Sequence, residues 1–338
     1  MILLDEWLSQ QLITNFPQRG KVNYSQRFLS VAEYLNNYVH PEIGKLAIVR
    51  HDGFLTDHGP EHVKTVIQRA SELIGDPTGK LSAYEVYLLL MACHFHDVGN
   101  IFGRGEHEKK LGPIMAKVGT LLGDDAVEIH AIQKIAAAHG GSIDGNKDTI
   151  SYLPVSDPVL GNKVHMQQLA AVLRFADELA DDYSRASRFL LDIDQVPKES
   201  EVFHMYAAHL HSVVVDSESS SVNLHFSFNK DVAVEKFGKR DSEVFLLNEI
   251  YERTMKMHLE RMYCSRFMSK IVRIDAVKVR IEVYPSNHSP ALLHAIGYRL
   301  EERGYPQAAE ADINSLCPDL EWTGETLCED LLSKSEVS

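Results

Sequence analysis

Six side chains between residues 62 and 177 have the types and spacing that could bind a metal ion. In chain order they are His62, the adjacent pair His96 and Asp97, His107, His139 and Asp177. Imidazole and carboxylate ligands together suit manganese, iron, cobalt, nickel or zinc better than calcium. No cysteine joins the set, which argues against a structural zinc site. His62, the pair and Asp177 could hold one divalent ion, and His107 and His139 could add a second.

Each of these residues also has a plain structural interpretation. An isolated His-Asp pair at the end of a buried helix is as often a hydrogen-bonded core pair as a ligand pair. Asp177 and Asp181 could each be a solvated surface acid on a helix that is apolar on its other side. The metal hypothesis therefore rests on the whole ordered set and not on any one member.

The element that must position the pair is the apolar stretch from Tyr87 to Phe95. It is too short to span a bilayer, and it is apolar all the way round, which predicts a helix buried on every side. Ser82 is the predicted N-cap of this helix, and His96 and Asp97 stand at its other end. Burying ionisable side chains there is costly unless they are paired or hold a metal.

Three further helices are expected to position the other members. They are predicted to begin at Pro60, near Asp125 and near Val164. A helix that begins at Pro60 leaves His58 in the loop before it. We place His139 inward rather than His130, because His139 ends its helix beside a glycine pair and the two residues face opposite sides. Asp177 lies next to the apolar stripe of the third helix.

The pattern changes after about residue 190, where alternating strands replace helical periodicity. Strands are predicted over 211–216, 222–228 and 276–284, the first two as a hairpin, with a helix over 242–268. We therefore expect a mainly α protein with a small α+β C-terminal module. The predicted divisions are 1–190 for the helical metal-binding domain, 191–290 for the module, and 291–338 for a helix and an acidic tail. The loop 142–163, whose first half is polar, is either a lid or ordered insertion over a cleft or a plain surface excursion.

Composition narrows the functional classes. The net charge of −14 over 338 residues argues against a broad, sequence-independent grip on a nucleic-acid backbone. No apolar window is long enough for a membrane span, and the first residues lack the features of a signal peptide. The four cysteines show no CxxC spacing and are expected to be free thiols in a reducing cytoplasm. A homo-oligomer is a further expectation.

The order His, His-Asp, His, His, Asp over residues 50–185 resembles the HD superfamily of metal-dependent phosphohydrolases. The local contexts also match at Asp57–Val63, at His96–Gly99 and at Arg174–Asp177. The resemblance implies an HD-type helical bundle with the metal in its core. It implies four primary ligands and two ligands of the two-metal members: His62, His96, Asp97 and Asp177, then His107 and His139. Asn100 departs from the lysine that many members carry, and the surrounding loops look closer to members found in bacterial antiviral systems.

The resemblance implies a metal-dependent hydrolase that acts on a nucleotide. The ion would be Mn, Fe, Co, Ni, Mg or Zn. Predicted catalytic residues are Asp97, His107 and Arg104, and predicted substrate contacts are His58, Arg104, Lys109, Lys110 and Arg174. A deoxynucleoside triphosphate triphosphohydrolase is the first expectation, and a cyclic nucleotide or dinucleotide phosphodiesterase is the alternative. A non-catalytic nucleotide-binding module and a di-iron oxygenase on the same fold are two further alternatives.

Overall fold

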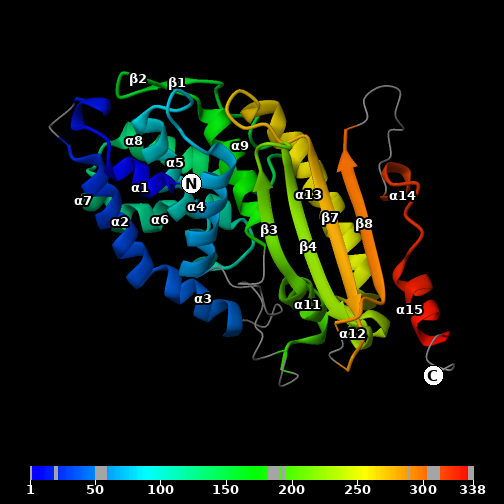
Figure 1. The fold of residues 1–338 in the computed structure, drawn as a ribbon. Coiled ribbons are helices and arrows are strands. Elements are labelled where there is room, and N and C mark those ends of the chain that lie inside the picture. The colour runs from blue at the N-terminus through cyan, green and yellow to red at the C-terminus, as the bar shows by residue number, and fades with distance from the viewer. Residues whose placement is uncertain are drawn as a thin grey trace. The chain divides into compact units, whose positions relative to one another are not determined.

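The computed structural model describes residues 2–18, 22–49, 59–181, 191, 195–287, 290–302 and 313–333. The chain forms two compact units. The helical unit comprises residues 1–48, 58–180 and 263–273, and the sheet unit comprises residues 49–57, 181–262 and 274–338. Figure 1 shows both, with helices through the first half of the chain and the larger sheet in the second half. The predicted mainly α fold with a small α+β module is confirmed.

The helical unit is built mainly from helices. Its longer helices are α2 (Tyr24–Tyr38), α3 (His40–Val49), α4 (Pro60–Ile74), α5 (Ala83–Phe95), α8 (Ala126–Ala137) and α9 (Met166–Leu179). Its shorter elements are α1 (Leu4–Ser9), η1 (Ile13–Asn15), η2 (Val98–Phe102), η3 (His107–Lys109), α6 (Gly112–Lys117) and α7 (Gly119–Leu122). The strands β1 (Asp157–Val159) and β2 (Asn162–Val164) pair antiparallel between α8 and α9.

Helix α5 is the centre of this unit. Every residue from Ala83 to Phe95 is buried, as the apolar sequence predicts. The helix touches α1, α2, α4, α8 and α9, which surround it (Figure 1). Ser82 caps its first turn, and the Ser82 backbone N–H donates to the Glu85 carboxylate, so the start of the helix is fixed. Because the start of α5 is fixed, the positions of His96 and Asp97 at its other end are fixed as well.

Glu128, a buried acid on α8, connects α8 to α2 and α5. Glu128 accepts hydrogen bonds from Arg27 of α2 at 2.9 Å and from Tyr84 of α5 at 2.7 Å. The Tyr87 hydroxyl donates a longer bond of 3.3 Å. Burial raises the pKa of Glu128, and its hydrogen bonds with the tyrosines and the charge of Arg27 counter that rise. These contacts hold α8, whose end carries His139, in place against α5.

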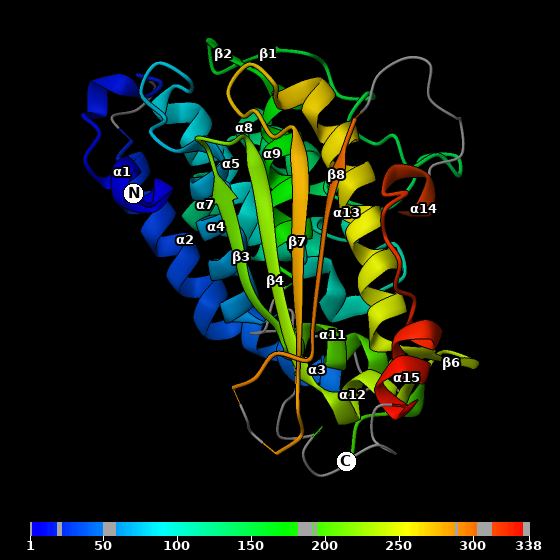
Figure 2. The same ribbon diagram turned by 45° about the vertical axis from the view of Figure 1, so that its right-hand side comes forward.

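The sheet unit has a four-stranded sheet in the order β3-β4-β7-β8. Its strands are β3 (Leu210–Asp216), β4 (Ser221–Asn229), β7 (Ala276–Tyr284) and β8 (His294–Glu301). The two central strands are parallel, and the two outer pairs are antiparallel. Helix α13 (Leu246–Met268) connects the parallel strands and runs alongside the sheet (Figure 2). Smaller elements are η5 (Lys198–Ser200), α11 (Glu201–His209), α12 (Lys230–Val234), β5 (Lys236–Lys239), β6 (Ser242–Phe245), α14 (Ile313–Leu316) and α15 (Gly324–Ser333).

The structure differs from the sequence expectation in three places. Ser242–Phe245 is the strand β6, so α13 begins four residues later than predicted. His294–Glu301 is the edge strand β8, where a helix and an acidic tail were expected. Its alternation is short: Ile296, Tyr298 and Leu300 are buried, and only Gly297 and Arg299 separate them. Residues 263–273, which the sequence assigned to the C-terminal module, belong to the helical unit.

Within the described residues, no helix combines the length and the hydrophobicity needed to cross a lipid bilayer.

Candidate metal centre

The six predicted residues come together in the helical unit as two groups of three. The first triad is His62, His96 and Asp177, and the second triad is Asp97, His107 and His139. Within each triad, one nitrogen or oxygen atom from every residue lies within 4.8 Å of the others. The residues that the sequence separated by more than a hundred positions are therefore neighbours.

The first triad stands on the long helices. Pro60 occupies the first turn of α4, where its missing N–H costs nothing, and His62 follows two residues later. His96 is the C-cap of α5, and Asp177 lies in the last turn of α9. The Nε2 atom of His62 is 3.3 Å from Nε2 of His96 and 3.2 Å from Oδ1 of Asp177. These three atoms enclose a space that a single divalent ion could fill.

The second triad stands on turns. Asp97 directly follows the end of α5, with φ −106° and ψ 0°, a sparsely populated backbone region. His107 begins the short helix η3, and His139 lies just after the end of α8. The Nε2 atom of His107 is 3.3 Å from Nε2 of His139 and 3.1 Å from Oδ1 of Asp97.

Asp97 belongs to the second triad and also faces the first. Its Oδ1 faces His107 and His139, at 3.1 and 3.7 Å from their Nε2 atoms. Its Oδ2 faces the other triad, 3.5 Å from Nε2 of His62 and 3.4 Å from Nε2 of His96. One carboxylate thus presents an oxygen to each group.

The backbone fixes which ring nitrogen of three histidines points inward. In His96, His107 and His139, Nδ1 donates a hydrogen bond to the carbonyl three residues earlier, at 2.8, 3.0 and 2.6 Å. A carbonyl only accepts, so Nδ1 carries the hydrogen, and the neutral ring has its lone pair on Nε2. In the second triad, two such lone pairs face each other across 3.3 Å. That contact is unfavourable unless a cation or a proton lies between them, so the donor set fits a metal ion.

The pKa values of His96 and His107 show the same preference for positive charge, and that of His139 does not. Burial alone would lower the pKa of His96, but the Asp97 and Asp177 carboxylates together hold this pKa well above its usual value. The pKa of His107 is raised despite burial, again because of Asp97. Burial lowers the pKa of His139 to about 4. Burial would raise the pKa of Asp177, yet hydrogen bonds from His62 and His96 hold it well below its usual range.

Close packing joins the turns that carry the second triad. A Cβ atom on Gly99 would lie 1.9 Å from the carbonyl oxygen of His107, so only glycine lets these two turns touch. The buried carboxylate of Glu108 lies against Gly141, where φ is +71°, and stands 3.5 Å from Nδ1 of His107. No sequence pattern had indicated a role for Glu108. Its position directly after a predicted ligand was the signal that could have identified it.

The predicted substrate-contacting residues lie in different surroundings. Arg104 is exposed three residues before His107. Lys109 donates to Glu106 at 2.6 Å, and Lys110 donates to the carbonyl of Gly105 at 2.5 Å. His58 lies outside the described residues. Their roles in binding substrate stay predictions.

Arg174 and Asn100 are buried, and each lies three residues in sequence from a triad member, Asp177 and Asp97 respectively. The Arg174 guanidinium donates to the carbonyl of Lys147 and to the hydroxyl of Thr149, both at 3.0 Å. The predicted phosphate contact of Arg174 is untested. The side-chain amide of Asn100, in η2, makes no hydrogen bond within the described residues.

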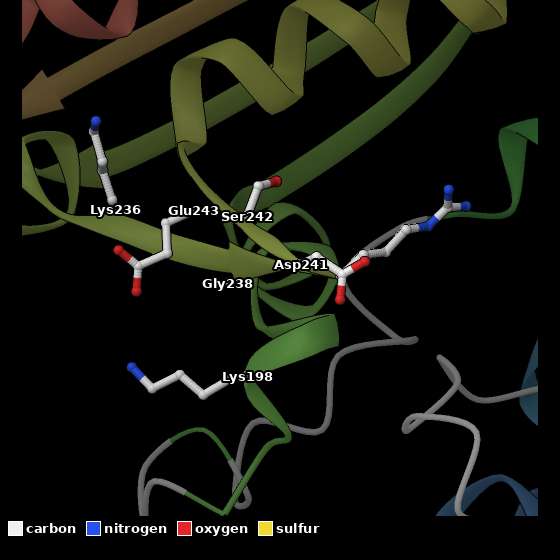
Figure 3. A pocket seen from close by; sticks show the side chains of 7 residues that line it. Lys198, Lys236, Gly238, Asp241, Ser242 and Glu243 are labelled. Atoms are coloured by element: carbon white, nitrogen blue, oxygen red, sulfur yellow. The ribbon is translucent and has the colours of Figure 1, made fainter.

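A separate hollow of about 530 Å³ lies in the sheet unit. It is lined by Lys198, Lys236, Gly238, Arg240, Asp241, Ser242 and Glu243. Figure 3 shows that the lysines and the acids point in different directions and do not converge on a common point. None of the six histidine and aspartate residues lines this hollow. It adds nothing to the metal centre.

Comparison with known proteins supports an HD-type domain. The HD-CE family model matches residues 52–254, which is more than half of the chain. The chain therefore belongs to the HD-CE family. The matched range contains all six residues of the two triads. No curated protein and no solved structure matches the chain.

Proposed function

We propose that this protein is a divalent-metal-dependent phosphohydrolase of the HD superfamily and that its substrate is a nucleotide. The observation that carries the proposal is the position of Asp97, whose two oxygens face different triads at 3.1 to 3.7 Å. A carboxylate with one oxygen toward each of two ligand sets suits a pair of divalent ions. Paired ions of this kind are a recurring feature of phosphatases and nucleases.

The residues fit such ions by donor type. His62, His96 and Asp177 would hold one ion, His107 and His139 would hold the other, and Asp97 would serve both. When bound, the ions would lower the pKa of water towards neutrality and offset the charge of a phosphoryl oxygen. Mn²⁺, Fe²⁺, Co²⁺, Ni²⁺ and Zn²⁺ suit this mixture of imidazole and carboxylate, and Mg²⁺ is included in the test.

Exposure indicates the side from which a substrate would approach. The side chains of His62 and His96 are completely buried, whereas 27% of Asp177 and 16% of His107 is exposed. A phosphoryl group would therefore meet the centre at the edge formed by Asp177 and His107. Arg104 is exposed and lies on the turn before His107, where its charge could attract a phosphate. The Asn100 amide, which has no hydrogen-bond partner among the described residues, could bond a substrate oxygen where other members use lysine.

Among nucleotides, we propose a deoxynucleoside triphosphate triphosphohydrolase first and a cyclic nucleotide or dinucleotide phosphodiesterase second. The two are separated by their products. Release of tripolyphosphate supports the first, and a linear product from a cyclic substrate supports the second. The resemblance of the loops around Asn100 to antiviral members extends the proposal to bacterial defence. Phage plating on cells that carry wild-type or Asp97→Ala protein tests that role.

The decisive experiment is a hydrolysis screen on metal-stripped protein. The protein is reloaded with Mn²⁺, Mg²⁺, Co²⁺ or Ni²⁺ and incubated with nucleoside triphosphates and cyclic nucleotides, beside an Asp97→Ala control. We expect metal-dependent turnover of at least one class in the wild type and loss of turnover in the control. Equal activity in the two proteins would falsify the proposal. Oxygen uptake by iron-loaded protein without phosphate release would favour the di-iron alternative instead.

A further inference from the structure

A chain of two hydrogen bonds connects α9, which carries Asp177, to the end of α8, which carries His139. Arg174 Nη1 donates to Oγ1 of Thr149 at 3.0 Å. That hydroxyl then donates to the carbonyl of Ala138 at 2.8 Å. Ala138 is the residue before His139. Arg174 and Thr149 are both buried, with 7% and 5% of their surface exposed.

The loop around Thr149 is held from a second direction. The Tyr263 hydroxyl donates to the Asp148 carboxylate at 2.7 Å and accepts from the backbone N–H of Ile150 at 3.0 Å. The Arg174 guanidinium lies over the Tyr263 ring, 4.6 Å from its centre. The guanidinium also donates to the carbonyl of Lys147 at 3.0 Å. The backbone on both sides of Thr149 is therefore fixed, and its hydroxyl has little freedom to turn away from Ala138.

The second triad needs such support more than the first. The carbonyl of Ala138 is at the end of α8, where the last carbonyl groups have no partner inside the helix. The Thr149 hydroxyl satisfies this carbonyl. His139 follows Ala138 directly, and its ring is oriented by the carbonyl of Ala136, three residues before His139. A shift of the helix end would therefore move both the backbone of His139 and the group that orients its ring.

We propose that Thr149 and Arg174 are positioning residues that set His139 for the second ion. The inference rests on the proposed two-ion centre. Groups that orient ligands from outside the ligand set typically change metal affinity by about 10- to 100-fold when they are removed. Loss of the Thr149 hydroxyl should therefore weaken the second ion selectively. A hydroxyl that only stabilised the loop would lower the melting temperature and leave the two affinities unchanged.

The test is a metal titration of three variants beside the wild type, with Mn²⁺ as the probe. Thr149→Val keeps the shape and removes the hydroxyl, and Thr149→Ser restores the hydroxyl. Thr65→Val is the matched control, because the Thr65 hydroxyl also donates to a carbonyl, that of Glu61, but on α4. Bound manganese is counted by elemental analysis after equilibrium dialysis, and thermal unfolding checks the fold.

We expect Thr149→Val to bind the second ion at least about tenfold more weakly than the wild type does. Its affinity for the first ion should stay within about twofold of the wild-type value. Thr149→Ser and Thr65→Val should match the wild type. Equal affinities in Thr149→Val and wild type, with two ions bound to each, overturn this inference alone. A wild-type protein that binds no second ion overturns it together with the two-ion centre.

Arg174→Lys provides an independent arm, because lysine keeps the charge but loses the planar fork. If Arg174 positions His139 through Thr149, this variant weakens the second ion and does not specifically raise KM at saturating metal. A raised KM with unchanged affinity for the second ion would assign Arg174 to the substrate and overturn the inference.

Discussion

The two triads use the same kinds of ligand, but they are supported differently. The first triad stands on the helices α4 and α9 and at the end of α5, and two of its three side chains are completely buried. The second stands on the residue after α5, on the three-residue helix η3, and just after α8. Two of its backbone segments touch only because Gly99 has no side chain.

This difference predicts unequal ion binding. Long, packed helices hold their side chains in one geometry, so the first triad is organised before an ion arrives. Short turns are held by few contacts and open at lower free-energy cost. We therefore expect the first ion to bind tightly and the second to bind more weakly and exchange faster.

The largest effect is expected at Asp97, because it serves both triads. Asp97→Asn keeps the shape and removes the charge, so both ions should be weakened. Metal ions supply several kcal/mol of charge stabilisation, which corresponds to a loss of turnover on the order of a thousandfold. Elemental analysis and single-turnover assays measure the two losses. Loss of only one ion would mean that Asp97 is not a ligand of both ions.

The next effect separates the triads. Asp177→Asn should abolish the first ion, and His139→Gln should abolish the second and leave the first bound, because each residue belongs to one triad. About one bound ion in His139→Gln, and lower overall metal affinity in Asp177→Asn than in His139→Gln, would support the expectation that the first ion binds more tightly. If both variants lose both ions, the triads act as one site and the comparison fails. His130→Gln, on the exposed side of α8, is the control.

A smaller effect is expected from Gly99→Ala. The added Cβ would collide with the His107 carbonyl and push apart the turns that carry the second triad. We expect about 10- to 100-fold weaker binding of the second ion, the range typical for disturbed outer contacts. Gly105→Ala is the matched control, because its Cβ would meet open space. Similar titration curves for both variants would show that the close approach of Gly99 to the His107 carbonyl does not affect binding of the second ion.

The smallest difference concerns pH. Each triad contains one histidine whose pKa is raised, His96 in the first and His107 in the second. Near neutral pH an ion must displace a proton from each, so affinity should rise with pH until the raised pKa is passed. His139, whose pKa is about 4, adds no proton near neutrality.

We therefore expect similar pH slopes for the two ions, about tenfold in affinity per pH unit for each proton released. Calorimetric titrations in buffers of different ionisation enthalpy count these protons. Clearly different counts would mean that protonation, and not rigidity, separates the two sites.

Local patterns in the sequence determined much of this protein. The capping box at Ser82 and Glu85, the proline at the start of α4 and the uniformly apolar α5 each fix structure within a few residues. The predicted β7 strand matches the structure from Ala276 to Tyr284. The types and order of the six histidine and aspartate residues also come from the sequence alone.

Only the tertiary structure decided how those residues divide. The sequence could not show that Asp97 faces two ways, that Gly99 touches His107, or that Arg174 bonds Thr149. Each of these contacts joins segments that periodicity treats separately. Periodicity reports which face of an element is buried, but the partner on that face is set by packing between elements distant in the chain.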